Sequence, residues 1–178
     1  MKNEIVIAGF GGQGILFSGK ILVYAGMMDG HQVSWLPSYG PEMRGGTANC
    51  SVIISDDPIG SPIVNDPEIL IAMNLPSLDK FEDAILTGGM AFIDSTLITR
   101  PVNRDDVKCF YIPSTQMANE AGLTGLANLI MLGKVVKEVE GCNLETIYKA
   151  IQKVVPERKK DMLEKNMKAV EMGYNYQG

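Results

Sequence analysis

The chain has 178 residues, of which 46% are hydrophobic and 21% are charged. These fractions argue against a disordered or fibrous protein, and the length predicts one domain spanning residues 1–178. The 16 Lys and Arg residues are outnumbered by 21 Asp and Glu residues, so the net charge of −5 argues against a nucleic-acid-binding protein. No apolar stretch reaches the ~20 residues that span a bilayer. We therefore expect no membrane association and a cytoplasmic location.

The cysteine and histidine content limits the chemistry of the chain. Cys50, Cys109 and Cys142 lie far apart in sequence, and no Cys-x-x-Cys pair is present. The chain alone therefore cannot supply four thiolates to an iron–sulfur cluster or a structural zinc site. The single histidine, His31, excludes a multi-histidine metal site and is expected at the surface or as a helix cap. We predict neither a catalytic residue nor a metal site within this chain.

Short apolar runs alternate with helical patterns along most of the chain. The first strand is expected at residues 4–8, the first helix at 14–28 and the second strand at 31–36. Further strands are expected at 47–55, 69–73, 90–93 and 109–112, and helices at 76–86, 114–121, 125–140, 144–155 and 157–173. Strands that alternate with helices predict an α/β fold. We expect a single Rossmann-like domain with a mainly parallel sheet, helices on both faces and a helical C-terminal third.

Two acidic pairs in the chain are expected to be solvated. Asp56 and Asp57 precede Pro58 and Gly60, which favours an exposed turn over a metal site. Asp105 and Asp106 stand beside Arg104 and are expected in a solvated loop for the same reason.

A glycine-rich segment follows the first predicted strand and opens the first predicted helix. Its members are Gly9, Gly11, Gly12, Gln13 and Gly14. The spacing Gly-x-Gly-x-x-Gly in this context occurs at dinucleotide sites. Such a site would require a carboxylate at the end of the second strand, where residues 33–38 have none. A tight strand-to-helix turn, close approach of a partner chain and an unrelated anion site therefore remain as alternatives.

A second unusual segment follows the second predicted strand. It comprises Ser38, Tyr39, Gly40, Pro41, Glu42, Met43, Arg44, Gly45 and Gly46. Ligands and partners of α/β proteins sit at the carboxyl edge of the sheet, where this segment and the glycine turn should both lie. A stiff loop that presents Tyr39 and Arg44 suits a contact surface. A solvated loop with a Glu42–Arg44 pair is an equal alternative.

The two segments together carry a resemblance to a known family. GFGGQG near the N-terminus, then SYGPEMRGGTANC and SDDPIGSPIV, resemble the gamma subunit of 2-oxoacid:ferredoxin oxidoreductases along the whole chain. Two segments are most similar to the 2-oxoglutarate type of this family, WLPSYGPEMRGGTANC and MNLPSLDKFE. The 2-oxoisovalerate type is close behind.

This resemblance implies a multi-subunit enzyme that decarboxylates a 2-oxoacid oxidatively with coenzyme A and reduces ferredoxin. The enzyme uses thiamine diphosphate and iron–sulfur clusters, and these are held mainly by other subunits. The expected partners are alpha, beta and delta (ferredoxin-like) subunits, and the isolated chain could also form a homodimer. The glycine turn and residues 39–46 carry the family motif and are expected to position or face the active site. A 2-oxoisovalerate or pyruvate enzyme, a stand-alone nucleotide-binding oxidoreductase and a purely structural module are the alternatives.

Overall fold

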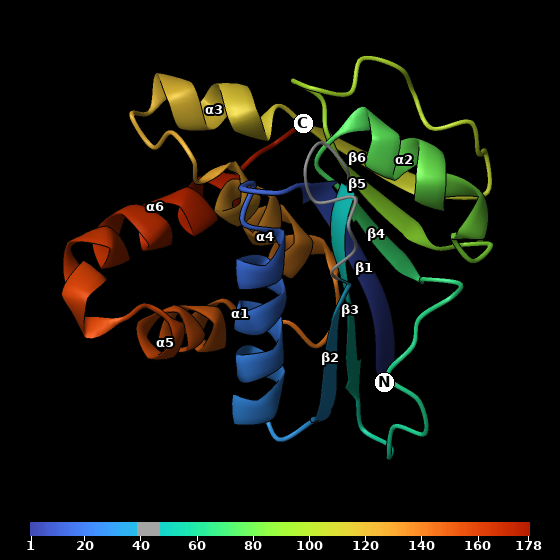
Figure 1. The fold of residues 1–178 in the computed structure, drawn as a ribbon, viewed down its shortest axis with the longest axis horizontal. Helices are drawn as coiled ribbons and strands as arrows, with labels where there is room; N and C mark the ends of the chain where they lie inside the picture. Colours follow the sequence, from blue (N-terminus) through green and yellow to red (C-terminus); the bar gives the residue numbers. More distant parts are fainter. Residues whose placement is uncertain (39–46) are drawn as a thin grey trace.

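A six-stranded sheet lies at the centre of the structure (Figure 1). The computed structural model describes residues 1–38 and 47–178. Its strands are β1 (Lys2–Phe10), β2 (Gln32–Ser38), β3 (Thr47–Ser55), β4 (Ile69–Ala72), β5 (Met90–Asp94) and β6 (Lys108–Ile112). The spatial order of the strands is β2-β3-β1-β4-β5-β6.

Strand β3 runs against the direction of its neighbours. It pairs antiparallel with both β1 and β2, whereas β1, β4, β5 and β6 pair in parallel. A parallel connection needs a crossover of a dozen or more residues, and residues 39–46 between β2 and β3 are too few. The predicted α/β fold with a mainly parallel sheet is confirmed, and the direction of β3 is the feature that the prediction did not include.

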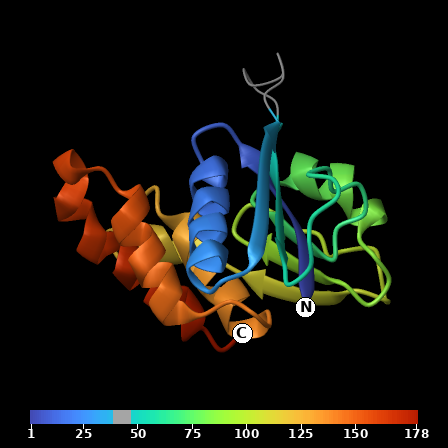
Figure 2. The same ribbon diagram turned by 90° about the horizontal axis from the view of Figure 1, so that it is seen from below.

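Helices cover both faces of the sheet, as predicted, but unequally (Figure 2). On one side lie α1 (Ile15–Met28), α4 (Ala127–Glu138), α5 (Leu144–Val154) and α6 (Leu163–Tyr174), with α3 (Ser114–Glu120) beside α4. On the other side lie α2 (Leu75–Phe81) and the short helix η2 (Glu82–Ala84). The predicted helix at 157–173 is divided, because the 3-10 helix η3 (Glu157–Met162) precedes α6 and contains a non-helical residue, Lys159.

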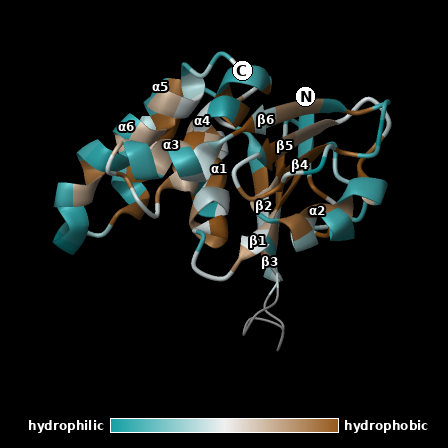
Figure 3. Cartoon of the chain, turned by 90° about the horizontal axis from the view of Figure 1, so that it is seen from above, coloured by the Kyte–Doolittle hydropathy of each residue, from teal (hydrophilic) through white to brown (hydrophobic). Residues whose placement is uncertain are grey.

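The strands supply apolar side chains to both layers. Ile5 and Ile7 of β1 pack into the core on the α1 and α4 side, whereas Val6 and Ala8 pack on the α2 side. This alternation follows from the two-residue period of a strand. Figure 3 shows the resulting hydrophobic sheet between helices whose outer surfaces are hydrophilic.

Helices α4 and α6 approach each other at two glycines. A Cβ atom added at Gly133 would collide with the carbonyl oxygen of Val170, and one added at Gly173 would collide with the carbonyl oxygen of Ile130. The two backbones are therefore in direct contact. This contact fixes the position of α6 against α4 within the helical layer.

The loop before β6 was predicted to be solvated, but its Arg104 side chain forms several hydrogen bonds within the protein. Arg104 Nε and Nη2 donate to the two carboxylate oxygens of Asp106 at 2.6 and 2.7 Å. The same guanidinium donates to the carbonyl oxygens of Glu82, Asp83 and Ile85. Asp106 is half-buried, while Asp105 is exposed as predicted. The solvated-loop prediction was wrong for Asp106 because Arg104 finds acceptors at the end of η2.

The Arg104–Asp106 pair predicts a pH dependence of stability. The hydrogen bond from Arg104 holds the pKa of Asp106 well below its ordinary value of 3.8. A carboxylate with a depressed folded-state pKa stabilises the protein above its unfolded-state pKa, and that contribution is lost as the pH falls below about 4. We expect Asp106→Asn to lower the urea midpoint at pH 7 and to flatten its decline on acidification. Asp105→Asn is the matched control, and parallel midpoint curves for the two variants would contradict this role of the pair.

Candidate functional site

The glycine turn occupies the carboxyl end of β1, at the centre of the sheet. Gly12 and Gly14 adopt φ values of +92° and +74°, in the left-handed region that favours glycine. A Cβ atom at Gly9 would lie 2.6 Å from Gln13 Oε1 and 2.9 Å from Met73 Cβ. These glycines are thus required by a tight strand-to-helix turn and by close packing.

Gln13 ties this turn to the neighbouring strand. Its Oε1 accepts a hydrogen bond from the Phe10 amide at 2.6 Å, and its Nε2 donates to the Met73 carbonyl at 3.1 Å. The side chain thereby joins the end of β1 to the residue that follows β4. Gln13 is a positioning residue of the turn.

Asn128, in the first turn of α4, holds the turn from the helical side. Its Nδ2 donates to the Gly14 carbonyl oxygen and to Ser18 Oγ, both at 3.1 Å. Asn128 is only 5% exposed. This residue was not predicted from the sequence. The available signal was a polar residue among the apolar positions Leu126, Leu129 and Ile130.

A small cavity lies beside the turn. It has a volume of about 190 Å³ and is lined in part by Gly12, Gln13, Leu97 and Thr115. Thr115 is fixed by the fully buried Asp94, whose Oδ2 accepts a hydrogen bond from the Thr115 hydroxyl at 2.5 Å. Among residues 1–38 and 47–178, all the side chains that line the cavity are uncharged.

Three large apolar side chains are exposed around this edge of the sheet. Phe10 ends β1, Leu75 follows β4 and Leu97 follows β5, and they are 42%, 37% and 42% exposed. We call these three residues and the turn at 11–14 the carboxyl edge. Exposed apolar groups that gather in one place are typical of interaction sites.

The strand register brings the second predicted segment to the same edge. Ser38, at the end of β2, lies opposite Asn49, which in turn lies opposite Ala8 of β1. Thr47, the first residue of β3, lies opposite Phe10. Both ends of the connection between β2 and β3 therefore lie near the glycine turn. The other predicted members, Tyr39, Gly40, Pro41, Glu42, Met43, Arg44, Gly45 and Gly46, lie outside the described residues.

The topology argues further against a dinucleotide at the glycine turn. In that type of site, the strand that follows the first helix lies beside the first strand and places its carboxylate on the ribose. Here β3 separates β2 from β1. A carboxylate at the end of β2 would therefore be displaced from the turn by one strand.

Of the remaining candidate residues, Cys50 lies beside the turn, with its Sγ 3.8 Å from the carbonyl oxygen of Ile15, whereas His31 lies just before β2, at the other end of that strand. Burial raises the pKa of the Cys50 thiol to about 12 and that of Cys142 to about 11, which keeps both thiols protonated. His31 Nδ1 contacts Asp56 at 2.8 Å, and the N-terminal amine contacts the same carboxylate at 2.6 Å. Within the described residues, no group of three His, Cys, Asp or Glu side chains could hold a metal ion. None of the described helices has both the length and the hydrophobicity of a membrane span.

The bridge made by Gln13 carries a testable stability prediction. Gln13→Ala leaves the Phe10 amide and the Met73 carbonyl without this partner, so we expect the free energy of unfolding to fall by about 1–2 kcal/mol. Urea denaturation followed by circular dichroism measures the change. The exposed Gln152 of α5 provides the control variant, Gln152→Ala, which should be within about 0.5 kcal/mol of the parent. Equal stability of the two variants would show that the bridge contributes nothing.

Comparison with known proteins places this geometry in context. Residues 4–176 match the family model described as pyruvate ferredoxin/flavodoxin oxidoreductase. The 2-oxoglutarate synthase subunit KorC of Methanocaldococcus jannaschii is 39% identical over 177 residues, which cover 98% of this chain and 93% of that protein. The ketoisovalerate oxidoreductase subunit VorA of Methanothermobacter thermautotrophicus is 38% identical over 171 residues. That match covers 96% of this chain and 35% of VorA, so the chain spans about a third of the length of the VorA relatives.

Solved structures show the same fold. The gamma subunit of a keto/oxoacid ferredoxin oxidoreductase from Geobacter sulfurreducens superposes with a TM-score of 0.83 at 31% identity and covers 97% of this chain and 96% of that one. The 2-oxoglutarate:ferredoxin oxidoreductase of Magnetococcus marinus matches with a TM-score of 0.88 at 22% identity, over 97% of this chain and 30% of that one. The second likeness concerns the fold alone.

Proposed function

Because the chain belongs to the pyruvate ferredoxin/flavodoxin oxidoreductase family, we propose that it is the gamma-type subunit of a 2-oxoacid:ferredoxin oxidoreductase complex. The complex converts a 2-oxoacid and coenzyme A into acyl-CoA and carbon dioxide and passes the electrons to ferredoxin. Its partners are alpha, beta and ferredoxin-like delta subunits. The family membership carries this proposal, and the exposed carboxyl edge supports a role in assembly.

The cofactors of this complex are assigned to the partner subunits. Burial raises the pKa of the thiols of Cys50, Cys109 and Cys142, so the thiols of this chain are poorly suited to hold an iron–sulfur cluster. Thiamine diphosphate supplies the electron sink for decarboxylation when it is bound by the partners. The residues of this chain shape the surface next to that site. Gln13 and Asn128 hold the turn rigid, while Phe10, Leu75 and Leu97 provide apolar area for docking.

The substrate we propose is 2-oxoglutarate. The 39% identity to KorC of Methanocaldococcus jannaschii over 177 residues supports this choice. The 38% identity to VorA supports 2-oxoisovalerate as the second candidate. Pyruvate is a third candidate, since a pyruvate/ketoisovalerate gamma subunit of Thermococcus kodakarensis is 26% identical.

Purification of the tagged chain from its native extract tests the proposal. The eluate is assayed for coenzyme A-dependent dye reduction with 2-oxoglutarate, 2-oxoisovalerate and pyruvate in parallel. We expect larger subunits to co-purify and activity to be highest with 2-oxoglutarate. Activity with another acid would correct the substrate alone. A chain that elutes alone and without activity would contradict the proposed complex.

Arg44 belongs to the motif shared with the family and is proposed to face the partner subunits. We expect Arg44→Ala to lower the yield or the turnover of the complex about tenfold, because arginines are frequent anchors of interfaces. The unfolding midpoint of the isolated chain should not change. Lys165→Ala, on the exposed face of α6, is the control. A complex with unchanged yield and rate would exclude a role for Arg44.

A further inference from the structure

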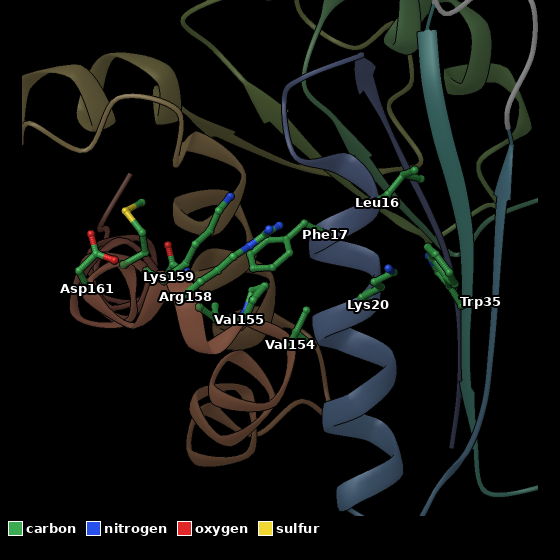
Figure 4. A pocket seen from close by; sticks show the side chains of 12 residues that line it. Leu16, Phe17, Lys20, Trp35, Val154, Val155, Arg158, Lys159 and Asp161 are labelled. Carbon is green, nitrogen blue, oxygen red and sulfur yellow. The ribbon is translucent and has the colours of Figure 1, made fainter.

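A second and larger hollow begins at the first turn of α1, directly after the glycine turn, and runs along that helix. It is a groove of about 750 Å³ between α1 and β2 on one side and the segment from α5 through η3 to α6 on the other. Figure 4 shows Phe17 and Lys20 on α1, Trp35 on β2, and Arg158, Lys159 and Asp161 on η3. The volume falls within the range of small-molecule sites, about 300–1,000 Å³.

The groove combines an apolar floor with positive charge. Leu16, Phe17, Val154 and Val155 contribute apolar surface. Lys20, Arg158 and Lys159 contribute three cations, and in the part of the chain that the structure describes none of them forms an ion pair with a carboxylate. By contrast, the neighbouring Lys160 is paired with Glu157 at 2.7 Å. These three cations therefore remain available to an anionic ligand in the groove.

The aromatic and polar groups restrict the shape of a ligand. The ammonium of Lys20 lies 5.2 Å from the centroid of the Trp35 ring, so this cation is held at the β2 side of the groove. Phe17 offers a ring against which a planar group can stack. Asn166, only 4% exposed, and Asp161 provide an amide and a carboxylate that can hydrogen-bond the edge of a heterocycle.

We propose that this groove binds a nucleoside di- or triphosphate. The base packs against Phe17 and the apolar floor, and the phosphates lie among Lys20, Arg158 and Lys159. Guanidinium and ammonium groups form strong charge-assisted hydrogen bonds with phosphate. A 2-oxoacid would fill little of the volume and would leave the apolar floor uncovered. The groove and the cavity beside the glycine turn share no lining residue, so nucleotide binding can be tested on the isolated chain without the proposed complex.

Trp35 makes the test direct, because it is the only tryptophan in the chain and it lines the groove. The full-length chain is titrated with ATP, ADP, adenosine and tripolyphosphate while its tryptophan emission is recorded, and calorimetry repeats each titration. We expect saturable binding of ATP and ADP with Kd below about 1 mM. Adenosine and tripolyphosphate should each bind at least about tenfold more weakly, since each lacks half of the contacts.

Charge variants show whether the groove is responsible. Arg158→Gln combined with Lys159→Gln should weaken ATP binding about tenfold or more, because it removes two charge-assisted contacts. Lys160→Gln, on the same helix but outside the groove, should leave the affinity unchanged, and the unfolding midpoints of all variants verify that they fold.

Three results would overturn the proposal. The first is the absence of saturable binding up to about 5 mM nucleotide, well above the expected Kd. The second is equal affinity for tripolyphosphate and ATP, which would indicate an anion site without selection for the base. The third is a loss of ATP affinity in Lys160→Gln as large as that in the double variant of Arg158 and Lys159, which would indicate diffuse electrostatic attraction.

A groove that binds no nucleotide but is protected in the assembled complex would be a subunit interface.

Discussion

Gly173→Ala is expected to lower the free energy of unfolding by about 3 kcal/mol. The added Cβ would collide with the carbonyl oxygen of Ile130, which belongs to the backbone of α4. A backbone atom cannot rotate away as a flexible side chain can, so the two helices must separate. The higher helix propensity of alanine, about 1 kcal/mol, offsets only part of this cost. Urea denaturation of the isolated chain measures the change.

Two further glycine variants make this prediction specific. Gly133→Ala should cost a similar amount, because its Cβ would meet the carbonyl oxygen of Val170 on α6. Gly60→Ala is the matched control, since nothing lies within 4 Å of its added Cβ. If Gly173→Ala unfolds at the same urea concentration as Gly60→Ala, the close contact between α4 and α6 is wrong.

Gly14→Ala is expected to cost about 3 kcal/mol and also to impair assembly of the complex. Two causes add at this position. Gly14 has a φ of +74°, which alanine rarely adopts, and its Cβ would collide with the side chain of Asn128. Gly12→Ala separates the two causes, because its φ is +92° but nothing lies within 4 Å of the added atom. We expect Gly12→Ala to cost about 1–2 kcal/mol, the backbone strain alone.

A double-mutant cycle identifies the collision with Asn128. Asn128→Ala removes the obstructing amide, so Gly14→Ala should cost less in that background than in the parent, by at least about 1 kcal/mol. Additive effects of the two substitutions would show that the collision does not occur. Co-purification of the partner subunits with each variant then reports how the shape of the turn affects docking.

Much of the sheet could be predicted from local sequence patterns. The strand expected at 47–55 coincides with β3, and the helix expected at 14–28 begins one residue before α1. Apolar runs that are buried on both faces and glycines at fixed spacing are local signals. The direction of β3 was not predictable in the same way, because strand direction follows from pairing between distant segments. The short connection at 39–46 was the available clue.

The candidate site also has features that local sequence patterns predict and features that depend on long-range contacts. The glycine turn was predicted, and its residues lie at the carboxyl edge as expected. The roles of Gln13 and Asn128 depend on hydrogen bonds to Met73 and Gly14, which are 60 and 114 residues away in sequence. The contact of Gly173 with Ile130 is likewise a long-range one. No local pattern encodes such partners.

Hydrogen exchange of backbone amides, compared between the isolated chain and the purified complex, tests most directly whether the carboxyl edge is the docking surface. Our account predicts slower exchange in the complex at residues 10–15, 74–78 and 95–98. Protection confined to the opposite edge of the sheet, at residues 28–32 and 86–90, would contradict it.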